Sequence, residues 1–172
     1  TTDDGIAKIL ERLEKDEWKE NFYGFNALRS LYKHHPEQFK NYLPKFKEHI
    51  KEGVENLRSS ICRNALILCE EVFATDKDLR EKGENGELTP YASFVEELIP
   101  TVCKKLADDK VFISSRAKGA IDAITQHCYG TEVTNQLCDL SRSKNFLKDH
   151  INVLLSIFFM LNFKIYEINF IN

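Results

Sequence analysis

Residues 55–66 of the chain read Glu55-Asn-Leu-Arg-Ser-Ser-Ile-Cys-Arg-Asn-Ala-Leu66, and this stretch decides the fold. We interpret it as a tight turn followed by a buried helix, because apolar residues recur at helical spacing from Ile61 onwards. Either serine of the Ser-Ser pair can cap that helix by accepting a hydrogen bond from a free N–H group of its first turn. The stretch therefore predicts an exposed Leu57-Arg58 pair at a rigid corner between two helices.

The same pattern occurs four times along the chain. Alignment on four positions, Ala27, Ala65, Ala120 and Asn152, superposes the apolar helical segments 22–31, 61–72, 113–124 and 146–157. An apolar pair precedes each segment in an upstream helix: Ile9/Leu13, Phe46/Ile50, Val102/Leu106 and Val133/Leu137. Helix-turn-helix units that repeat at roughly 40 residues are typical of HEAT and armadillo repeats. We therefore predict an all-α fold, an α-solenoid of about four HEAT-like helical hairpins in an armadillo-like superhelix.

The composition is that of a soluble globular domain with a sizeable core. The chain has 172 residues, of which 42% are hydrophobic and 30% charged. A formal net charge of −3 gives no general attraction to nucleic acid or to anionic lipid. Only 14 residues separate the charges of Asp149 and Lys164, fewer than the ~20 that a membrane span requires. We therefore expect neither a nucleic acid nor a membrane as partner.

The five cysteines, at positions 62, 69, 103, 128 and 138, lie within apolar helical stripes. Their number is odd and no two form a Cys-x-x-Cys pair, so we predict buried, reduced thiols in a cytosolic protein. A structural zinc site would need four ligands at usable spacing, and the sequence lacks them. We expect no bound metal.

Motifs of the common enzyme classes are missing from the sequence. It contains no Gly-x-Ser-x-Gly, phosphate-binding-loop, dinucleotide-binding or His-Glu-x-x-His pattern, and no histidine stands beside a plausible nucleophile. We therefore expect a protein that is not an enzyme and has no catalytic residues, no cofactor and no small-molecule substrate.

Turns within the repeats of a solenoid line one edge, and links between repeats line the other. The first edge would collect basic residues, Lys19, Arg58, Lys110, Arg142 and Lys144, together with the apolar Trp18, Leu57, Phe112 and Ile113. The acidic 76–87 loop would lie at the opposite edge. Such an edge suits an acidic, folded protein, because apolar anchors supply affinity and charges steer the encounter. The alternative is a set of ordinary solvated turn residues, with Trp18 closing the first helix pair.

Several stretches also carry a family resemblance: Asp16-Glu-Trp-Lys, Gly24-Phe-Asn-Ala-Leu-Arg, His35-Pro-Glu and Asn56-Leu-Arg-Ser-Ser-Ile-Cys-Arg-Asn-Ala. Phe112-Ile and Lys118-Gly-Ala-Ile-Asp-Ala match more weakly. In these stretches the sequence resembles the TOG domains of microtubule regulators, most closely the CLASP and crescerin group. The first two repeats match well, the third fairly and the fourth poorly.

The resemblance implies a flat paddle of HEAT repeats whose intra-repeat turns grip the αβ-tubulin heterodimer, with Trp18 against β-tubulin. The expected tubulin-binding residues are Trp18, Lys19, Leu57, Arg58, Ser59, Phe112, Ile113 and Lys144. The implied partner is αβ-tubulin or the microtubule, the implied role is regulation of microtubule dynamics, and the implied location is the cytoskeleton of the cytoplasm, at the cilium, spindle or centrosome. A generic HEAT-repeat scaffold for protein–protein interaction, without tubulin specificity, is the alternative.

TOG domains usually have six repeats, and about four are visible in this sequence. The apolar residues 151–172 lack the polar outer face that a terminal repeat needs. We assign residues 1–163 to the repeat domain, with truncation from six repeats as one interpretation, and residues 164–172 to an apolar C-terminal tail. The expected architecture is eight helices in four antiparallel pairs, with Trp18, Leu57 and Phe112 at a single edge.

Overall fold

The computed structural model of the protein describes residues 2–75 and 90–127. These residues form six α-helices and one short 3-10 helix: α1 (Thr2–Glu14), α2 (Trp18–His34), α3 (Pro36–Glu55), α4 (Ser59–Thr75), α5 (Pro90–Lys104), η2 (Lys105–Ala107) and α6 (Val111–His127). No strand occurs in these two ranges. The all-helical prediction is confirmed for this part of the chain. The predicted fourth pair, the acidic 76–87 loop and the 164–172 tail lie outside the described residues.

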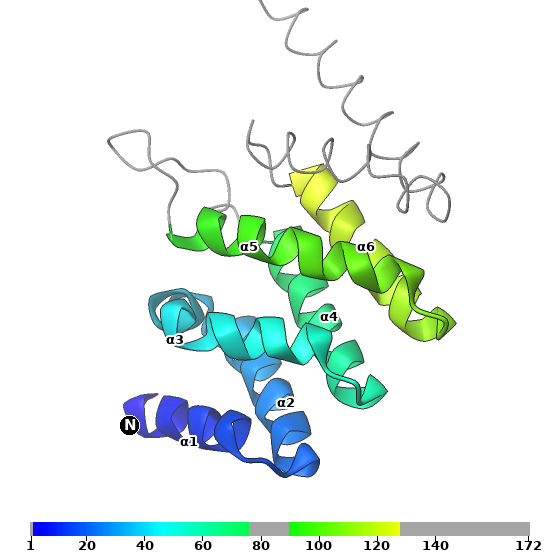
Figure 1. The fold of residues 1–172 in the computed structure, drawn as a ribbon. Helices are drawn as coiled ribbons and strands as arrows, with labels where there is room; N and C mark the ends of the chain where they lie inside the picture. The colour runs from blue at the N-terminus through cyan, green and yellow to red at the C-terminus, as the bar shows by residue number, and fades with distance from the viewer. Residues whose placement is uncertain (1, 76–89, 128–172) are drawn as a thin grey trace, which may run out of the picture.

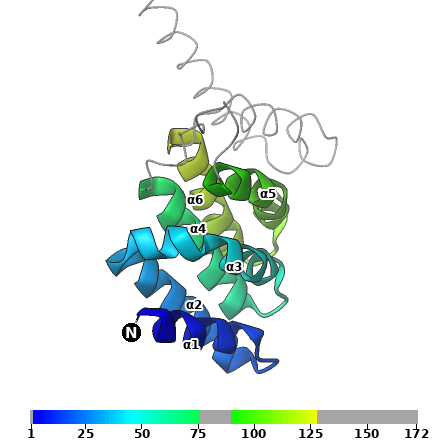
Figure 2. The ribbon, with the colours of Figure 1, turned by 90° about the vertical axis from the view of Figure 1, so that its left-hand side faces the viewer.

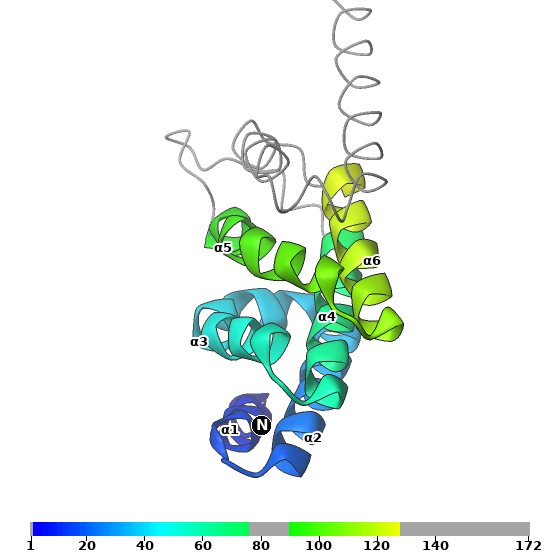
Figure 3. The ribbon, with the colours of Figure 1, turned by 45° about the vertical axis from the view of Figure 1, so that its right-hand side comes forward.

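The helices form three antiparallel pairs arranged in two layers (Figure 1). One layer contains α1, α3 and α5, and the other contains α2, α4 and α6 (Figure 3). Figure 2 shows the same order from the side, with α1 at one end of the stack and α5 and α6 toward the other. Within the second layer α4 contacts both α2 and α6, so it is the central helix of the described region.

The core lies between the two layers and is built from the residues that recur in the sequence. The three predicted pairs that fall in the described region, Ile9/Leu13, Phe46/Ile50 and Val102/Leu106, are all buried. Ala65 and Ala120 are fully buried, as expected where neighbouring helices approach closely. Ala27, which the sequence alignment places at the equivalent position, is only half-buried. Among the described helices, α2 has a neighbour in its own layer, α4, on one side only.

Polar contacts set the register of the second layer. Arg29 on α2 donates to the carboxylate of Glu71 at 2.9 Å and to the side-chain oxygen of Asn64 at 3.1 Å. The amide of Asn64 donates in turn to Asn26 at 2.8 Å. Asn64 is almost fully buried, so these bonds satisfy a group whose desolvation would otherwise be costly. A sliding movement of α2 along α4 would break them together.

Three cysteines fall within the described residues, and all three are buried and free. Burial raises the pKa of the Cys69 and Cys103 thiols to about 12. Burial also raises the pKa of Cys62, and the nearby positive charge of Lys105 opposes that effect. These thiols are therefore protonated at neutral pH. Cys128 and Cys138 lie outside the described residues.

None of the described helices is long and apolar enough to span a membrane. Within the same residues, no three His, Cys, Asp or Glu side chains gather closely enough to hold a metal ion.

Candidate protein-binding edge

The three connections within the helix pairs lie in a row along one edge of the molecule. They comprise residues 15–17, 56–58 and 105–110, and they follow one another up the right-hand side of Figure 1. The row arises because each pair is antiparallel and stacks on the previous pair in the same orientation. We call these connections, together with the first three residues of the helix after each, the turn edge.

The second and third turns are built alike. The N–H of Arg58 donates to the side-chain oxygen of Asn56 at 2.9 Å, and the N–H of Lys110 donates to the carboxylate of Asp108 at 3.0 Å. In both turns an Asn or Asp side chain therefore mimics a backbone turn, two residues before the residue that precedes the helix. The carbonyls of Arg58 and Lys110 then accept the first helical hydrogen bonds, from the N–H of Ile61 at 3.0 Å and of Ile113 at 2.7 Å.

This geometry corrects the predicted serine cap. Ser59 is the first residue of α4, so Arg58 occupies the cap position. The hydroxyl of Ser59 accepts a hydrogen bond from the ammonium of Lys110 at 2.6 Å instead of from the backbone of its own helix. The Asn56 side chain, and not the Ser59 hydroxyl, orders this turn.

The first turn is ordered by a residue of the helix that follows it, and not by a residue within the turn. The side-chain amide of Asn21, on α2, donates to the carbonyls of Arg12, Leu13 and Lys15 at 3.1, 3.1 and 2.7 Å. These carbonyls belong to the end of α1 and the residue just after it, where backbone acceptors lack helical partners. Asn21 therefore caps the end of α1. It also fixes the position of Trp18, which precedes Asn21 by three residues.

Large apolar side chains are exposed along the turn edge. Trp18 is 38% exposed, Phe112 48% and Leu57 94%. Each belongs to a different turn, so the structure brings together three residues that the sequence analysis assigned to one edge.

Two contacts join neighbouring turns. The guanidinium carbon of Arg58 lies 5.1 Å from the centre of a Trp18 ring, a cation–π distance that links the second turn to the first. The hydrogen bond between Lys110 and Ser59 links the third turn to the second. The turn edge is therefore one continuous surface across three helix pairs.

The remaining predicted residues have different positions. Ile113 is only 1% exposed and lies in the core, so its assignment to an exposed binding surface is wrong. The helix begins at Val111, and the rotation of its first turn directs the third residue inward while the first two stay at the surface. Lys19 is exposed at the first turn, as expected. Lys144 and Arg142 lie outside the described residues.

The structure adds two exposed apolar residues that the sequence analysis missed. Val111 is 75% exposed beside Phe112, and Tyr23 is 50% exposed on α2, with Arg12 lying 5.8 Å from its ring centre. The exposure of Val111 could have been predicted from the sequence, because it stands next to Phe112 at a short turn. Tyr23 lies inside an apolar helical segment, where sequence spacing alone does not separate a surface residue from a core residue.

Charges of both signs occur along the turn edge. Lys19, Arg58 and Lys110 are exposed, and so are the acidic residues Asp16, Glu17 and Asp109. The edge is therefore mixed in charge, since acidic residues temper the basic ones in the same turns. Two of the basic residues lie beside exposed apolar side chains: Arg58 is against the Trp18 ring, and Lys110 directly precedes Val111 and Phe112.

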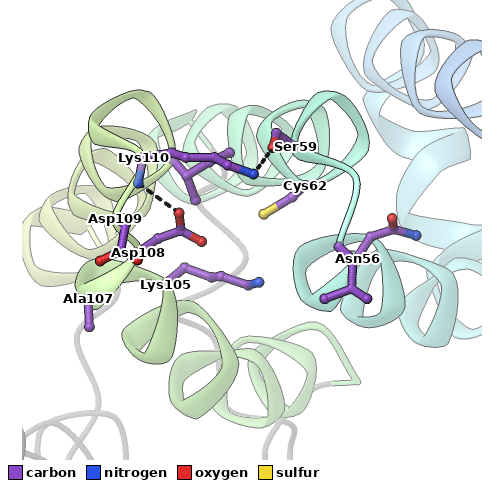
Figure 4. Close-up of a pocket in the computed structure, with 10 residues that line it drawn as sticks. Asn56, Ser59, Cys62, Lys105, Ala107, Asp108, Asp109 and Lys110 are labelled. Atoms are coloured by element: carbon purple, nitrogen blue, oxygen red, sulfur yellow. Dashed lines mark hydrogen bonds between the residues drawn. The ribbon is translucent and has the colours of Figure 1, made fainter.

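A cavity of about 320 Å³ lies between the second and third turns (Figure 4). Its walls include Leu57 and Ser59 from the second turn, and Lys105 and Lys110 from the third. Cys62 and Ile113 contribute apolar surface. The turn edge thus contains a recess as well as projecting side chains.

No protein-family model matches this chain, and no curated protein matches it. Over residues 2–75 and 90–127 the fold is all-helical, and the turn edge exposes apolar side chains.

Proposed function

We propose that this chain is a TOG-like domain, an α-solenoid of HEAT-like hairpins that binds the αβ-tubulin heterodimer through its turn edge and regulates microtubule dynamics. The two-layered stack of antiparallel pairs supports the solenoid interpretation, because each pair buries its apolar face against the next. The resemblance of the first two repeats to TOG domains supports tubulin as the partner. This function would bring the protein to the microtubules of the cytoskeleton.

The observation that carries the proposal is the exposed Trp18 in the first turn, with Arg58 of the second turn against its ring. A single exposed apolar side chain is normal on a protein surface. Here the tryptophan is held in place by a neighbouring turn, and Leu57 and Phe112 follow it along the same edge. A protein interface needs such a row of fixed apolar side chains. Tryptophan and arginine are also the residue types that dominate binding hot spots.

Charge supports an acidic partner at short range. The chain as a whole is slightly acidic, with a formal net charge of −3, so long-range attraction to an acidic protein is absent. The cations beside the anchors are nevertheless exposed and close to the contact surface. We therefore expect binding that weakens with salt, because exposed charge pairs are screened beyond a Debye length of about 8 Å at physiological ionic strength.

The test is equilibrium binding of the full chain to purified αβ-tubulin, measured by sedimentation or by fluorescence anisotropy at two salt concentrations. We expect a complex that forms at low salt and weakens as salt is added. Absence of binding at about 50 μM protein, equivalent to a binding free energy weaker than about −6 kcal/mol, would reject tubulin as the partner. The generic HEAT-repeat scaffold would then be the better description.

A further inference from the structure

Charged side chains line the cavity between the second and third turns, and a role as apolar anchors does not account for them. Lys105 approaches it from η2, and Lys110 approaches it from the position just before α6. In Figure 4 the Lys105 side chain extends into the cavity, toward the side on which Asn56 lies. Lys110 is on a different wall, where its ammonium donates to Ser59.

Two lysines supply hydrogen-bond donors to the cavity, and two aspartates also line it. The Lys105 residue is half-buried, and among the described residues its ammonium makes no hydrogen bond or ion pair. Lys110 uses one of its three ammonium hydrogens on Ser59, and the Ser59 hydroxyl, as the acceptor of that bond, keeps its own hydrogen to donate. Of the two aspartates that line the cavity, Asp108 uses one carboxylate oxygen to accept from the backbone N–H of Lys110, and Asp109 is exposed.

A carboxylate is the partner that an unpaired ammonium binds most strongly, because both members of the hydrogen bond are then charged. The exposed side chain of Leu57, which also lines the cavity, would contact the methylene groups of a longer acidic side chain. The volume of about 320 Å³ exceeds that of a single side chain, so bound water would share the space.

We propose that this cavity receives a glutamate side chain of the docked partner, with its carboxylate bound between Lys105 and Lys110. The inference rests on the proposed function for its biological setting, because the cavity opens within the same turn edge that would contact tubulin. It assigns to Lys105, which the sequence analysis did not select, a role in determining which partner binds. Leu57 beside the opening would contact the same region of the partner.

The first experiment tests the cavity without tubulin. Blocked glutamate, N-acetyl-glutamate N-methylamide, is titrated into the isotopically labelled full chain, and backbone amide shifts are followed by NMR at constant ionic strength. We expect shifts concentrated in residues 56–62 and 105–113, with the matched blocked glutamine binding at least about 5-fold more weakly. Equal shifts with both compounds, or shifts spread over unrelated surface lysines, would overturn the proposal.

Matched variants test the role of Lys105 in the same titration. Lys105→Met keeps the length of the side chain and removes its charge, so the glutamate shifts should disappear. Lys105→Arg should retain most of them. Lys104→Met makes the same charge change at an exposed neighbour that does not line the cavity, and it should leave them unchanged. Unaltered shifts in Lys105→Met would refute the assignment.

The second experiment repeats the comparison with αβ-tubulin. Lys105→Met should weaken binding about 5- to 30-fold through loss of a partly buried charge pair, whereas Lys104→Met should change it less than 2-fold. If wild-type protein binds tubulin and Lys105→Met binds equally well, the cavity proposal fails while the proposed function stands. If wild-type protein does not bind tubulin, the proposed function fails, and the blocked-glutamate titration decides the cavity proposal by itself.

Discussion

The guanidinium carbon of Arg58 lies 5.1 Å from the centre of a Trp18 ring, although the two residues belong to different helix pairs. The contact covers part of the indole and restricts its orientation at the edge of the molecule. It also connects the turn after α1 with the turn after α3 at a point where both are exposed. The first two turns therefore present their side chains as one unit.

The first prediction concerns this coupling. A double-mutant cycle with Trp18→Ala and Arg58→Ala should give an interaction free energy of about 0.5–1 kcal/mol, the range of an exposed cation–π pair. The measurement is urea unfolding followed by circular dichroism, because Trp18 is the only tryptophan and cannot serve as the probe after its removal. A cycle of Trp18→Ala with Lys33→Ala, at the far end of α2, should show no coupling. A value near zero for both cycles would mean that the contact is energetically unimportant.

The second prediction concerns affinity for αβ-tubulin. Trp18→Ala should weaken binding by roughly 2–4 kcal/mol, about 30- to 1,000-fold, if Trp18 is a hot spot. Arg58→Ala should act mainly on the association rate and on the salt dependence, because its charge lies at the surface. Circular dichroism should show that both variants remain folded, and Lys33→Ala serves as the control distant from the turn edge. Wild-type affinity in Trp18→Ala would reject the turn edge as the binding surface.

The third prediction compares two glycines within helices. A Cβ added at Gly53 on α3 would overlap the Phe25 ring, whereas one added at Gly5 on α1 meets nothing within 4 Å. Gly5→Ala should therefore stabilise the protein by up to about 1 kcal/mol through helix propensity, and Gly53→Ala should destabilise it by about 1–3 kcal/mol through overpacking. Thermal unfolding measures both changes. A stabilising Gly53→Ala would show that α3 and α2 are not closely packed.

The fourth prediction concerns alanines of the second layer. Ala65→Leu and Ala120→Leu should each cost about 1–3 kcal/mol, because both positions are fully buried and the added side chain must displace its neighbours. Ala27→Leu should cost less, since Ala27 is half-buried. The measurement is the free energy of unfolding in urea. Equal costs at all three positions would contradict the one-sided packing of α2 in the described region.

The fifth prediction concerns stability at alkaline pH. The pKa of Cys69 and Cys103 is raised by burial to about 12, from an ordinary value of 9.0. Below pH 9 each thiol is protonated in both states, and its contribution to stability is fully present. Between pH 9 and pH 12 the unfolded thiol ionises first, so stability falls by at most about 1.4 kcal/mol per pH unit per thiol.

Lysines also titrate in this range, so the informative comparison is with Cys69→Ala. Its unfolding free energy should fall less steeply than that of the wild type above pH 9. Thiol alkylation followed by mass spectrometry gives an independent check. Cys62, Cys69 and Cys103 should react slowly in the native protein and rapidly after denaturation. Rapid native labelling of Cys62 and Cys69 would contradict their burial and reopen a redox or metal role.

The sequence by itself determined the helices and their core-facing residues. The pairs Ile9/Leu13 and Phe46/Ile50 were identified as core because a helix returns to the same face after about 3.6 residues, a property of the local chain. Exposure of Trp18, Leu57 and Phe112 followed from their places in short turns that connect those helices. Both inferences require only neighbouring residues.

Tertiary structure decided the details of the turn edge. Ile113 is buried because α6 packs on α4, and Ser59 binds Lys110 because the third turn lies against the second. The contact of Arg58 with Trp18 and the cavity around Lys105 likewise form only when successive helix pairs stack. The physical reason is that these features depend on the rotation and spacing of one packed pair relative to the next, and a local sequence period does not specify those quantities.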